Sequence, residues 1–296
     1  FPPVIEFHDT ASDLLLCYAR MRLASRSAKM GEVKPIIVSV DPVWDRIRDE
    51  AAEIIRSEPV MASLVHSVIL SHSTLEVALS HRVAHRLASG EMTESILYNA
   101  FEEAYAAGCR LGDVARTDIL AVFERDPACH RYIQPLLFYK GFQAVQAYRL
   151  AHWFWVHGRK DLAYFMQMRT SEVFSVDIHP AAKIGRGLMI DHAHSIVIGE
   201  TAVVGDNVSM LHSVTLGGTG KDDHDRHPKI GNNVMLGAGA KVLGNIKVGN
   251  CSRVAAGSVV LHAVPACKTV AGVPARVVGE AGCDQPSALM DQLLHD

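Results

Sequence analysis

From Val176 onward, aliphatic residues recur at every sixth position of the sequence. Thirteen such positions fall into three series, which are Ile178, Ile184 and Ile190, then Ile198, Val204, Met210 and Leu216, and finally Ile230, Leu236, Val242, Val248, Val254 and Val260. A glycine or alanine often follows the aliphatic residue directly. This hexapeptide repeat is typical of a parallel β-helix, in which three short strands form one triangular coil of about 18 residues. We therefore expect a left-handed β-helix in this half of the chain.

Aromatic residues and glycines are divided unevenly between the two halves of the chain. All 19 aromatic residues lie at or before Phe174, whereas 16 of the 22 glycines lie at or after residue 176. Successive coils of a β-helix stack at the sheet spacing of about 4.8 Å, so each inward aliphatic side chain packs on its equivalent in the next coil. A Phe or Trp would not fit so narrow a prism, and glycine turns corners that need a positive φ. The two halves are therefore expected to pack by different rules.

The aromatic-rich half shows helical periodicity and residues that mark helix boundaries. Asp41 is expected to cap a helix that begins at Pro42, and Thr93 can cap another. The expected helical segments share an apolar periodicity and are 42–55, 64–87, 96–105, 119–123 and 132–174. This half is therefore predicted to be an all-α domain.

Together these patterns predict an α+β chain with four parts. They are an N-terminal extension over 1–40, an α-helical domain over 41–175, the β-helix over 176–279 and a C-terminal tail over 280–296. One coil cannot bury its faces alone, so a β-helix needs several coils and a cap. The helical domain is expected to cap the β-helix and to take part in oligomerisation.

Composition limits the classes of protein to which the chain can belong. Its 29 Lys and Arg nearly balance 32 Asp and Glu, which removes the broad attraction of a nucleic-acid or anionic-membrane binder. A run of about 18 apolar residues is absent, which excludes a membrane span. The six cysteines have no zinc-like spacing and indicate reduced thiols in a cytoplasmic protein. The basic residues of 14–30 also suit an organellar transit peptide, but acidic residues precede them, so we expect an extension without that role.

Two breaks in the six-residue phase identify segments that must leave the prism as loops. Eight residues separate Ile190 from Ile198, so two are extra, and fourteen separate Leu216 from Ile230. The longer break leaves an excursion over 218–229, which contains the sequence D-R-H-P. Long loops on regular scaffolds tend to carry function.

A group of acidic residues and histidines lies next to the first break. His192 directly follows Asp191, and the stretch from Asp177 to Asp191 is shorter than one coil. We therefore expect these side chains on adjacent coils at similar lateral positions. An imidazole whose second nitrogen bonds a carboxylate is a general-base unit. The residue types alone also allow a purely structural role at corners, and Arg226 of the long loop suits either a bound carboxylate or solvent.

Seven motifs of the chain are specific when they are taken together. They are V-D-I-H-P-A-A-K-I-G-R-G, D-H-A, E-T-A-V, S-V-T-L-G-G-T-G-K, D-R-H-P-K-I-G, G-A-G-A-K-V-L-G-N and A-G-V-P-A-R. From about Asp41 to about Gly279 the chain resembles the serine O-acetyltransferase family. The hexads alone would indicate only the wider hexapeptide acyltransferase class. The resemblance implies acetyl transfer from acetyl-CoA to the hydroxyl of L-serine, in cysteine biosynthesis and within a ternary complex.

The resemblance also implies a role for each matching position. His192 would be the general base that removes the serine hydroxyl proton, and Asp177 would be its dyad partner. The serine ammonium would face Asp126 and Asp191, and the serine carboxylate would face Arg226 and His227. Acetyl-CoA would be a cosubstrate rather than a permanently bound cofactor, with its pantetheine arm near Gly218, Thr219, Ala238 and Ala256. No metal ligand is implied.

The family resemblance extends to assembly and partners. It implies a homo-oligomer, either a trimer or a dimer of trimers, with active sites between neighbouring β-helices. It also implies inhibition by L-cysteine in the serine site and binding of O-acetylserine sulfhydrylase through a C-terminal tail that ends in isoleucine. This sequence ends Leu293-Leu294-His295-Asp296, so either the tail is trimmed or sulfhydrylase binding is lost.

Three other functions stay open at this stage. A hexapeptide acetyltransferase for another hydroxyl acceptor would keep His192 without needing Asp126, Arg226 and His227 together. A zinc enzyme resembling the γ-type carbonic anhydrases would use histidines between subunits. A non-catalytic scaffold for the sulfhydrylase is disfavoured, because every matched catalytic position is occupied.

Overall fold

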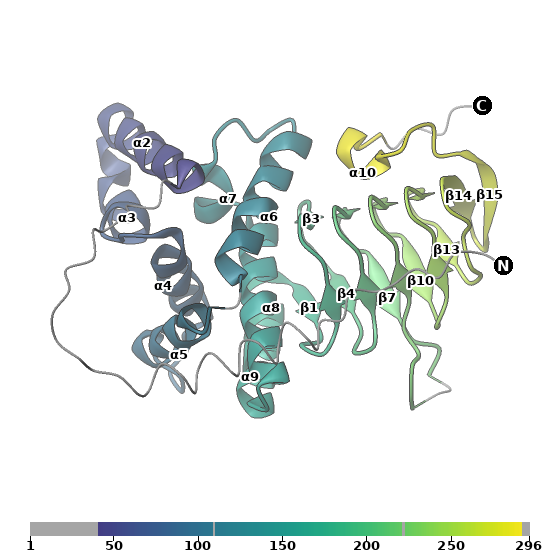
Figure 1. Ribbon diagram of the computed structural model, residues 1–296, viewed down its shortest axis with the longest axis horizontal. Coiled ribbons are helices and arrows are strands. Elements are labelled where there is room, and N and C mark those ends of the chain that lie inside the picture. The colour runs from purple at the N-terminus through teal and green to yellow at the C-terminus, as the bar shows by residue number, and fades with distance from the viewer. Residues whose placement is uncertain (1–40, 109, 221–222, 292–296) are drawn as a thin grey trace, which may run out of the picture.

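The computed structural model describes residues 41–108, 110–220 and 223–291, so the expected extension over 1–40 and residues 292–296 lie outside the described residues. The described chain consists of a helical part and a parallel β-helix that meet end to end along the long axis of the molecule (Figure 1). The expected order of an all-α part followed by a parallel β-helix is confirmed.

The first helix begins where the sequence predicts. Helix α2 spans Pro42–Ser57, and the Asp41 carboxylate accepts a hydrogen bond from the Trp44 N–H at 3.1 Å. An Asp at this position satisfies one of the free N–H groups of the first turn. The apolar face of α2 is buried and contains Val43, Trp44, Ile47, Ala51 and Ile54.

The apolar run over 64–87 does not form one helix, which corrects the expectation. It is divided among η1 (Pro59–Met61), α3 (Ala62–Val65), the π-helical η2 (His66–Leu70) and α4 (Leu75–Leu87). The chain bends by 118° before α4, where the Thr74 hydroxyl accepts a hydrogen bond from the Val77 N–H. Periodicity does not reveal the bend because both parts bury apolar side chains in the same core.

Within the described ranges, no single helix is long and apolar enough to cross a membrane. The bent pair of segments 59–70 and 75–87 reaches that length and composition together.

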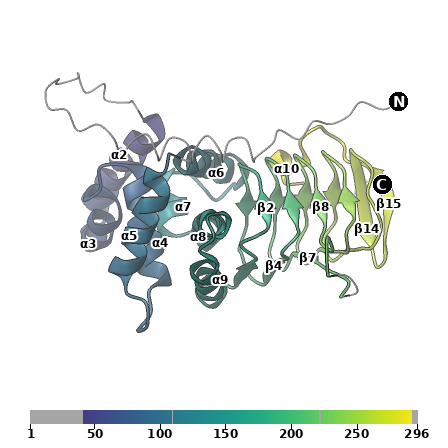
Figure 2. The same cartoon turned by 60° about the horizontal axis from the view of Figure 1, so that its bottom comes forward.

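The remaining helices carry the chain to the β-helix. They are α5 (Glu94–Ala106), α6 (Leu111–Arg125), α7 (Ile133–Leu137), α8 (Lys140–Val156) and α9 (Lys160–Phe174). The segment 132–174 is therefore three helices rather than one. Thr93 precedes α5 as expected, but its hydroxyl bonds the Ser95 hydroxyl instead of the backbone. Helix α8 is buried along most of its length and lies with α9 beside the first coil (Figure 2).

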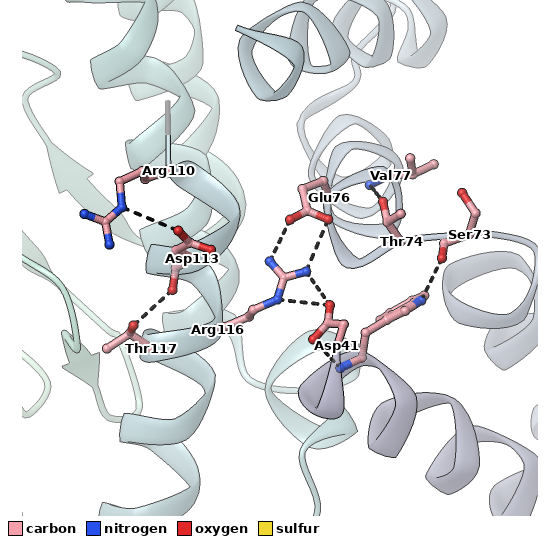
Figure 3. Close-up of polar contacts among 10 residues, drawn as sticks. Asp41, Ser73, Thr74, Glu76, Val77, Arg110, Asp113, Arg116 and Thr117 are labelled. Atoms are coloured by element: carbon pink, nitrogen blue, oxygen red, sulfur yellow. Dashed lines mark hydrogen bonds and ion pairs between the residues drawn. The ribbon is translucent and has the colours of Figure 1, made fainter. Parts of the chain in front are cut away.

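The cap residue of α2 also joins three helices through ion pairs. Arg116 of α6 donates to the Asp41 carboxylate and, at 2.6 Å, to Glu76 of α4 (Figure 3). Burial alone would raise the pKa of Asp41, but hydrogen bonds from Arg116 and the Trp44 N–H outweigh it and hold this pKa below its ordinary 3.8. Asp41 is therefore ionised at neutral pH and holds α2 against α4 and α6.

The β-helix stacks its coils away from α8 and α9 (Figure 2). Its strands are β1 (Val176–Ile178), β2 (Lys183–Ile184), β3 (Met189–Ile190), β4 (Ile196–Ile198), β5 (Val203–Val204), β6 (Ser209–Met210), β7 (Thr215–Gly217), β8 (Lys229–Ile230), β9 (Met235–Leu236), β10 (Lys241–Leu243), β11 (Lys247–Val248), β12 (Arg253–Val254), β13 (Val259–Val260), β14 (Lys268–Gly272) and β15 (Ala275–Glu280). Sheet A has the order β1-β4-β7-β10-β13, sheet B the order β11-β8-β5-β2, and sheet C the order β15-β14-β12-β9-β6-β3.

The aliphatic positions of the repeat become columns inside the prism. In sheet C, Ile190 pairs with Met210, Met210 with Leu236 and Leu236 with Val254, and these side chains are at most 6% exposed. The six-residue series therefore runs around the prism, whereas the packing neighbour of each residue lies one coil later. This geometry explains the absence of aromatic residues after Phe174.

The described part of the C-terminal tail folds back along sheet C. Strand β15 pairs antiparallel with β14, and the short helix α10 (Pro286–Leu289) then lies over β9 and near α6 (Figure 1). The Ser209 hydroxyl of β6 donates to the Ser287 carbonyl at 2.9 Å.

Candidate active site

A cavity of about 490 Å³ lies where the end of α6, the start of α8 and the end of β3 meet. Its walls include Asp126 and the segments 138–142 and 189–192. Asp126 directly follows α6, and its carboxylate accepts a hydrogen bond from the Ala128 N–H at 2.8 Å. The cavity therefore brings together three predicted site residues, namely Asp126, Asp191 and His192. We call this group the first half-site.

The turn after β3 presents the His192 side chain, which is 66% exposed. His192, Ala193 and Ser195 all have positive φ angles, of 58°, 48° and 55°, in a region that such residues rarely adopt. Strained backbone of this kind clusters at functional sites. Nε2 of His192 lies 3.4 Å from a carboxylate oxygen of Asp191. The two extra residues predicted for this break are therefore accommodated in a strained turn.

Two side chains outside the predicted set also line this cavity. The Tyr139 hydroxyl donates to a backbone carbonyl at 3.2 Å, and burial, followed by the nearby Cys129 and Asp126, raises the pKa of Tyr139 to about 12. Nζ of Lys140 lies 3.1 Å from Nδ1 of His194, and burial lowers the pKa of Lys140. Tyr139 therefore keeps its proton beside the two acidic residues at neutral pH.

Arg226 and His227 lie elsewhere, at the corner between sheets A and B. We call them the second half-site. Nη2 of Arg226 lies 2.6 Å from a carboxylate oxygen of Glu200, and this hydrogen bond lowers the pKa of Glu200. A hollow of about 510 Å³ beside them is lined by Glu200, Gly218, Gly220, Asp223 and Arg226. Glu200 is therefore an ionised partner that holds the guanidinium in place.

Thr201 orients the His227 ring. The Thr201 N–H donates to Nδ1 of His227 at 3.2 Å, so the neutral ring carries its proton on Nε2. Burial, and then the positive charges of Arg226 and Lys229, lower the pKa of His227 from its ordinary 6.5. Nε2 of His227 packs against Gly199, and a Cβ at that glycine would lie only 1.9 Å from Nε2. His227 is therefore a neutral hydrogen-bond donor at pH 7, and Arg226 beside it supplies the charge.

Asp177 lies on sheet A, apart from His192. It pairs in register with Val197, and its carboxylate accepts a hydrogen bond from Gln167 of α9 at 2.7 Å. Within the described chain, His192 forms its ion pair with Asp191 and not with Asp177. The expected similar lateral position is therefore wrong. Asp191 directly follows β3 of sheet C, whereas Asp177 lies within β1 of sheet A, so the corner that holds the two extra residues separates them.

His192 begins a column of corner residues along the edge between sheets C and A. Because sheet C is in register, the equivalent corner positions of successive coils are His192, His212, Ala238 and Ala256. The His212 ring meets the His192 ring edge-on with centroids 5.7 Å apart, and in the described chain Nδ1 of His212 is buried without a hydrogen-bond partner. Two of the predicted acetyl-CoA residues thus share an edge with His192.

The other two predicted acetyl-CoA residues belong to the opposite edge of sheet A. Gly218 lines the hollow beside Arg226, and Thr219 follows it in the same loop. A Cβ on Gly244 of the next coil would lie 3.2 Å from Cγ2 of Thr219. The four predicted acetyl-CoA residues therefore divide between the two edges of sheet A.

Sequence reasoning missed three residues of these edges. It assigned no site role to His212, although His212 follows His192 by one coil when the two extra residues are included. It did not single out Glu200 and Thr201, which stand in the E-T-A-V motif. Their partners lie in the long loop, and sequence spacing does not show how that loop folds back.

Known proteins resemble this chain over most of its length. The family model described as "Serine acetyltransferase, N-terminal" matches residues 43–147, and the model "Bacterial transferase hexapeptide (six repeats)" matches residues 227–262. The serine acetyltransferase of Salmonella typhimurium is 55% identical over 250 residues, which cover 84% of this chain and 92% of that protein.

Three solved structures show the same fold. The chain matches the serine acetyltransferase of Vibrio cholerae with a TM-score of 0.84 and 53% identity, over 85% of this chain and 97% of that one. It matches the enzyme of Brucella abortus in complex with coenzyme A with a TM-score of 0.81 and 55% identity, over 82% and 98% of the two chains. It matches a serine acetyltransferase in complex with cysteine with a TM-score of 0.84 and 50% identity, over 86% and 98%.

Proposed function

Because the chain belongs to the serine acetyltransferase family, we propose that it transfers the acetyl group of acetyl-CoA to the hydroxyl of L-serine. The products are O-acetyl-L-serine and CoA. The observation that carries this function is the first half-site, in which an exposed imidazole and two carboxylates share one cavity. A base beside groups that bind a cation suits an acceptor with both an ammonium and a hydroxyl.

The two half-sites together complement the charges of a free amino acid. Asp126 and Asp191 face the serine ammonium, and Arg226 and His227 receive its carboxylate. Arg226 supplies a charged fork, and His227 supplies the Nε2 proton that its bond from Thr201 leaves available. Fixing both ends of serine orients its hydroxyl toward the thioester and lowers the entropic cost of the reaction.

His192 acts as the general base of the transfer. It takes the hydroxyl proton as the serine oxygen attacks the thioester carbonyl carbon, and it returns that proton to sulfur when the carbon–sulfur bond breaks. Its dyad partner is Asp177 of the neighbouring subunit, because the two side chains are not paired within one chain; this carboxylate holds the ring tautomer and stabilises the imidazolium. A positioned base of this kind contributes about 10² to 10⁴-fold to the rate.

Acetyl-CoA binds along the edges of the β-helix. The small residues Ala238 and Ala256 leave the backbone accessible along the edge that begins at His192, and Gly218 and Thr219 do so on the opposite edge. The complex of the Brucella abortus relative with coenzyme A supports this cosubstrate. After acetyl transfer the product CoA leaves the site, so acetyl-CoA is a cosubstrate and not a permanent cofactor.

The active site forms between subunits of a homo-oligomer, either a trimer or a dimer of trimers joined by the helical domains. This assembly is supported by the separation of the half-sites and of Asp177 from His192 within one chain. In a cyclic ring, one surface of each subunit meets a different surface of its neighbour. The edge with His192 then faces a neighbour's edge with Arg226.

L-Cysteine inhibits by occupying the serine site. It carries the same ammonium and carboxylate as serine, and a relative has been solved in complex with cysteine. We place the enzyme in the cytoplasm, because the four described cysteines are free thiols. Sulfhydrylase binding through the tail stays a prediction, because residues 292–296 lie outside the described part of the chain.

The central test measures thiol release from acetyl-CoA with L-serine. His192→Ala is expected to lower turnover by at least about 10²-fold, whereas the exposed control His262→Ala changes it by less than about twofold. Unaltered turnover in His192→Ala would remove this residue from the mechanism. Hydroxyl acceptors that lack the ammonium or the carboxylate should be poor substrates, and equal rates with them would favour a different acceptor.

A mixing experiment tests the shared site. His192→Ala and Arg226→Ala chains are each expected to be nearly inactive with subsaturating serine. After unfolding and random reassembly as a mixture, about a quarter of the interfaces would combine an intact His192 with an intact Arg226 of the neighbour. Recovery of about a quarter of the wild-type activity supports a site between subunits. Mixed oligomers without recovery would place both residues in one subunit.

The zinc-enzyme alternative places its histidines between subunits, so metal analysis of the purified protein tests it. In residues 41–108, 110–220 and 223–291, no group of three or more His, Cys, Asp or Glu side chains is arranged to hold a metal ion. Stoichiometric zinc that is required for activity in the purified protein would overturn the proposed mechanism.

A further inference from the structure

Two cysteines occupy the same position on adjacent coils at the open end of the β-helix. Val248 pairs with Val264 and Arg253 pairs with Thr269, so the register offset is the same on both sides of the corner. Cys251 lies between Val248 and Arg253, and the same offset leads from Cys251 to Cys267. The two cysteines are therefore direct neighbours across the coils.

Their backbone conformations are also matched. Cys251 has a φ of 57° and Cys267 a φ of 59°, and each continues a column of left-handed corner residues that includes Asn207 and Asn233. The Cys251 N–H donates to the Asn232 carbonyl, and the Cys267 N–H donates to the Asn250 carbonyl, one coil back in each case. Stacked strands place equivalent Cα atoms about 4.8 Å apart. A disulfide needs a Cα separation of about 4.4–6.8 Å, and the stacking distance meets this condition.

The thiols are accessible and close to each other. Cys267 is exposed and Cys251 is partly exposed, whereas Cys129 is buried among the helices. Burial raises the pKa of the Cys251 thiol, and the neighbouring Cys267 raises it further. Cys267 is therefore the thiol that an incoming small molecule meets first.

We propose that Cys251 and Cys267 form a redox modification site, which closes to an inter-coil disulfide in the presence of a small disulfide such as oxidised glutathione. The Cys267 thiolate attacks the small disulfide and releases one thiol, which leaves a mixed disulfide on Cys267. The Cys251 thiolate then attacks the Cys267 sulfur and releases the second thiol. The two cysteine sulfurs lose two electrons and two protons, and the small disulfide gains both.

The disulfide would fasten the last coils of the β-helix. The end of a solenoid has a neighbour on one side only, so its coils open more readily than those in the middle. Here the Cys267 carbonyl also accepts the Ala281 N–H, which connects the C-terminal strand to this corner. We expect the disulfide to slow hydrogen exchange of the amides in 254–272 by about tenfold or more, because it closes a loop of about 15 residues.

Peptide mapping tests the proposal without reference to catalysis. The full chain is treated with oxidised glutathione, the free thiols are alkylated, and the protein is digested with trypsin without reduction. Trypsin cuts after Lys247, Arg253 and Lys268, so the two cysteines fall on separate peptides, 248–253 and 254–268. The expected result is a linked pair of these peptides that is two hydrogen atoms lighter than their sum.

Variants identify the partner of each thiol. Cys283→Ser should keep the linked pair, because Cys283 lies beyond the matched corners, and Cys267→Ser should abolish it and leave Cys251 free or bound to glutathione. The proposal is overturned if both thiols stay free, if glutathione stays on either cysteine without a link, or if the link passes through Cys283.

Discussion

The most informative perturbation of the fold is Asp118→Asn at the joint between the helical part and the β-helix. The Asp118 side chain is fully buried on α6 and accepts hydrogen bonds from Arg149 at 2.7 and 2.9 Å and from Gln146 at 2.9 Å. It also accepts the N–H groups of Gly187 and Leu188 in the first coil, at 2.8 and 3.1 Å. One carboxylate therefore connects two helices to the β-helix.

The size of the effect follows from this burial. Asparagine has one acceptor oxygen and one NH₂ group in place of the two carboxylate oxygens. Its NH₂ group would therefore face hydrogen-bond donors, which belong either to Arg149 and Gln146 or to the backbone of the first coil. The guanidinium of Arg149 is 7% exposed and would lose its only full negative partner among the described ion pairs. Breaking a buried pair by removing one partner costs about 3–5 kcal/mol. In a chain of this size, that loss lowers the melting temperature by roughly 6–20 °C.

Thermal unfolding followed by circular dichroism measures this change. The matched control is Glu103→Gln, which removes the ion pair of Glu103 with Arg159, whose side chains are 52% and 41% exposed. An exposed pair is worth at most about 1 kcal/mol, so the control should melt close to the wild type. Equal shifts in the two variants would refute the assignment of Asp118 as the central contact of the joint.

Three further predictions concern the site and its supports. Gly141→Ala should lower the stability by about 1–3 kcal/mol and also lower kcat/KM, because the new Cβ would lie 2.0 Å from the last carbonyl oxygen of β3. The control Gly90→Ala, whose Cβ would meet no atom within 4 Å, should change neither quantity. A fully active Gly141→Ala protein would contradict this prediction. Asp41→Asn keeps the helix cap but loses the charge that Arg116 binds, so it should destabilise the protein at pH 7. The folded pKa of Asp41 lies below 3.8, so the wild type loses this advantage as the pH falls through that pKa. A stability difference between the two proteins that is equal at pH 7 and pH 2 would oppose the assignment. Glu200→Gln weakens the 2.6 Å contact that holds the Arg226 guanidinium, so it should raise the KM for serine by roughly tenfold and change the KM for acetyl-CoA little. Equal changes in both KM values would count against a role of Glu200 in serine binding.

Local rules account for the features that were predicted correctly. The helix start at Pro42 follows from a cap whose bonds lie within four residues, and the strands follow from a six-residue period that each coil repeats. The bend before Thr74 and the breaks within 132–174 were missed, because apolar periodicity continues through them while the tertiary core determines the direction of each helix.

The candidate site shows the same division. The motifs identified His192 and Arg226, and the E-T-A-V motif holds Glu200, but spacing placed Asp177 beside His192 in error. Spacing gives a position around the prism only when the length of every coil is known. The two extra residues lie in the corner between Asp191 and Val197, the register partner of Asp177, and this corner separates the two carboxylates.

The sequence by itself determined that half of this chain is a narrow aliphatic prism, because its repeat and its lack of aromatic residues allow few other ways to bury the apolar surface. Only the tertiary structure decided that His192 and Arg226 lie on opposite edges of sheet A, and that Cys251 lies directly across from Cys267. The period of a coil is a local property that each hexad repeats. The meeting of two side chains depends instead on the summed lengths of the coils and loops between them, which only the folded chain displays.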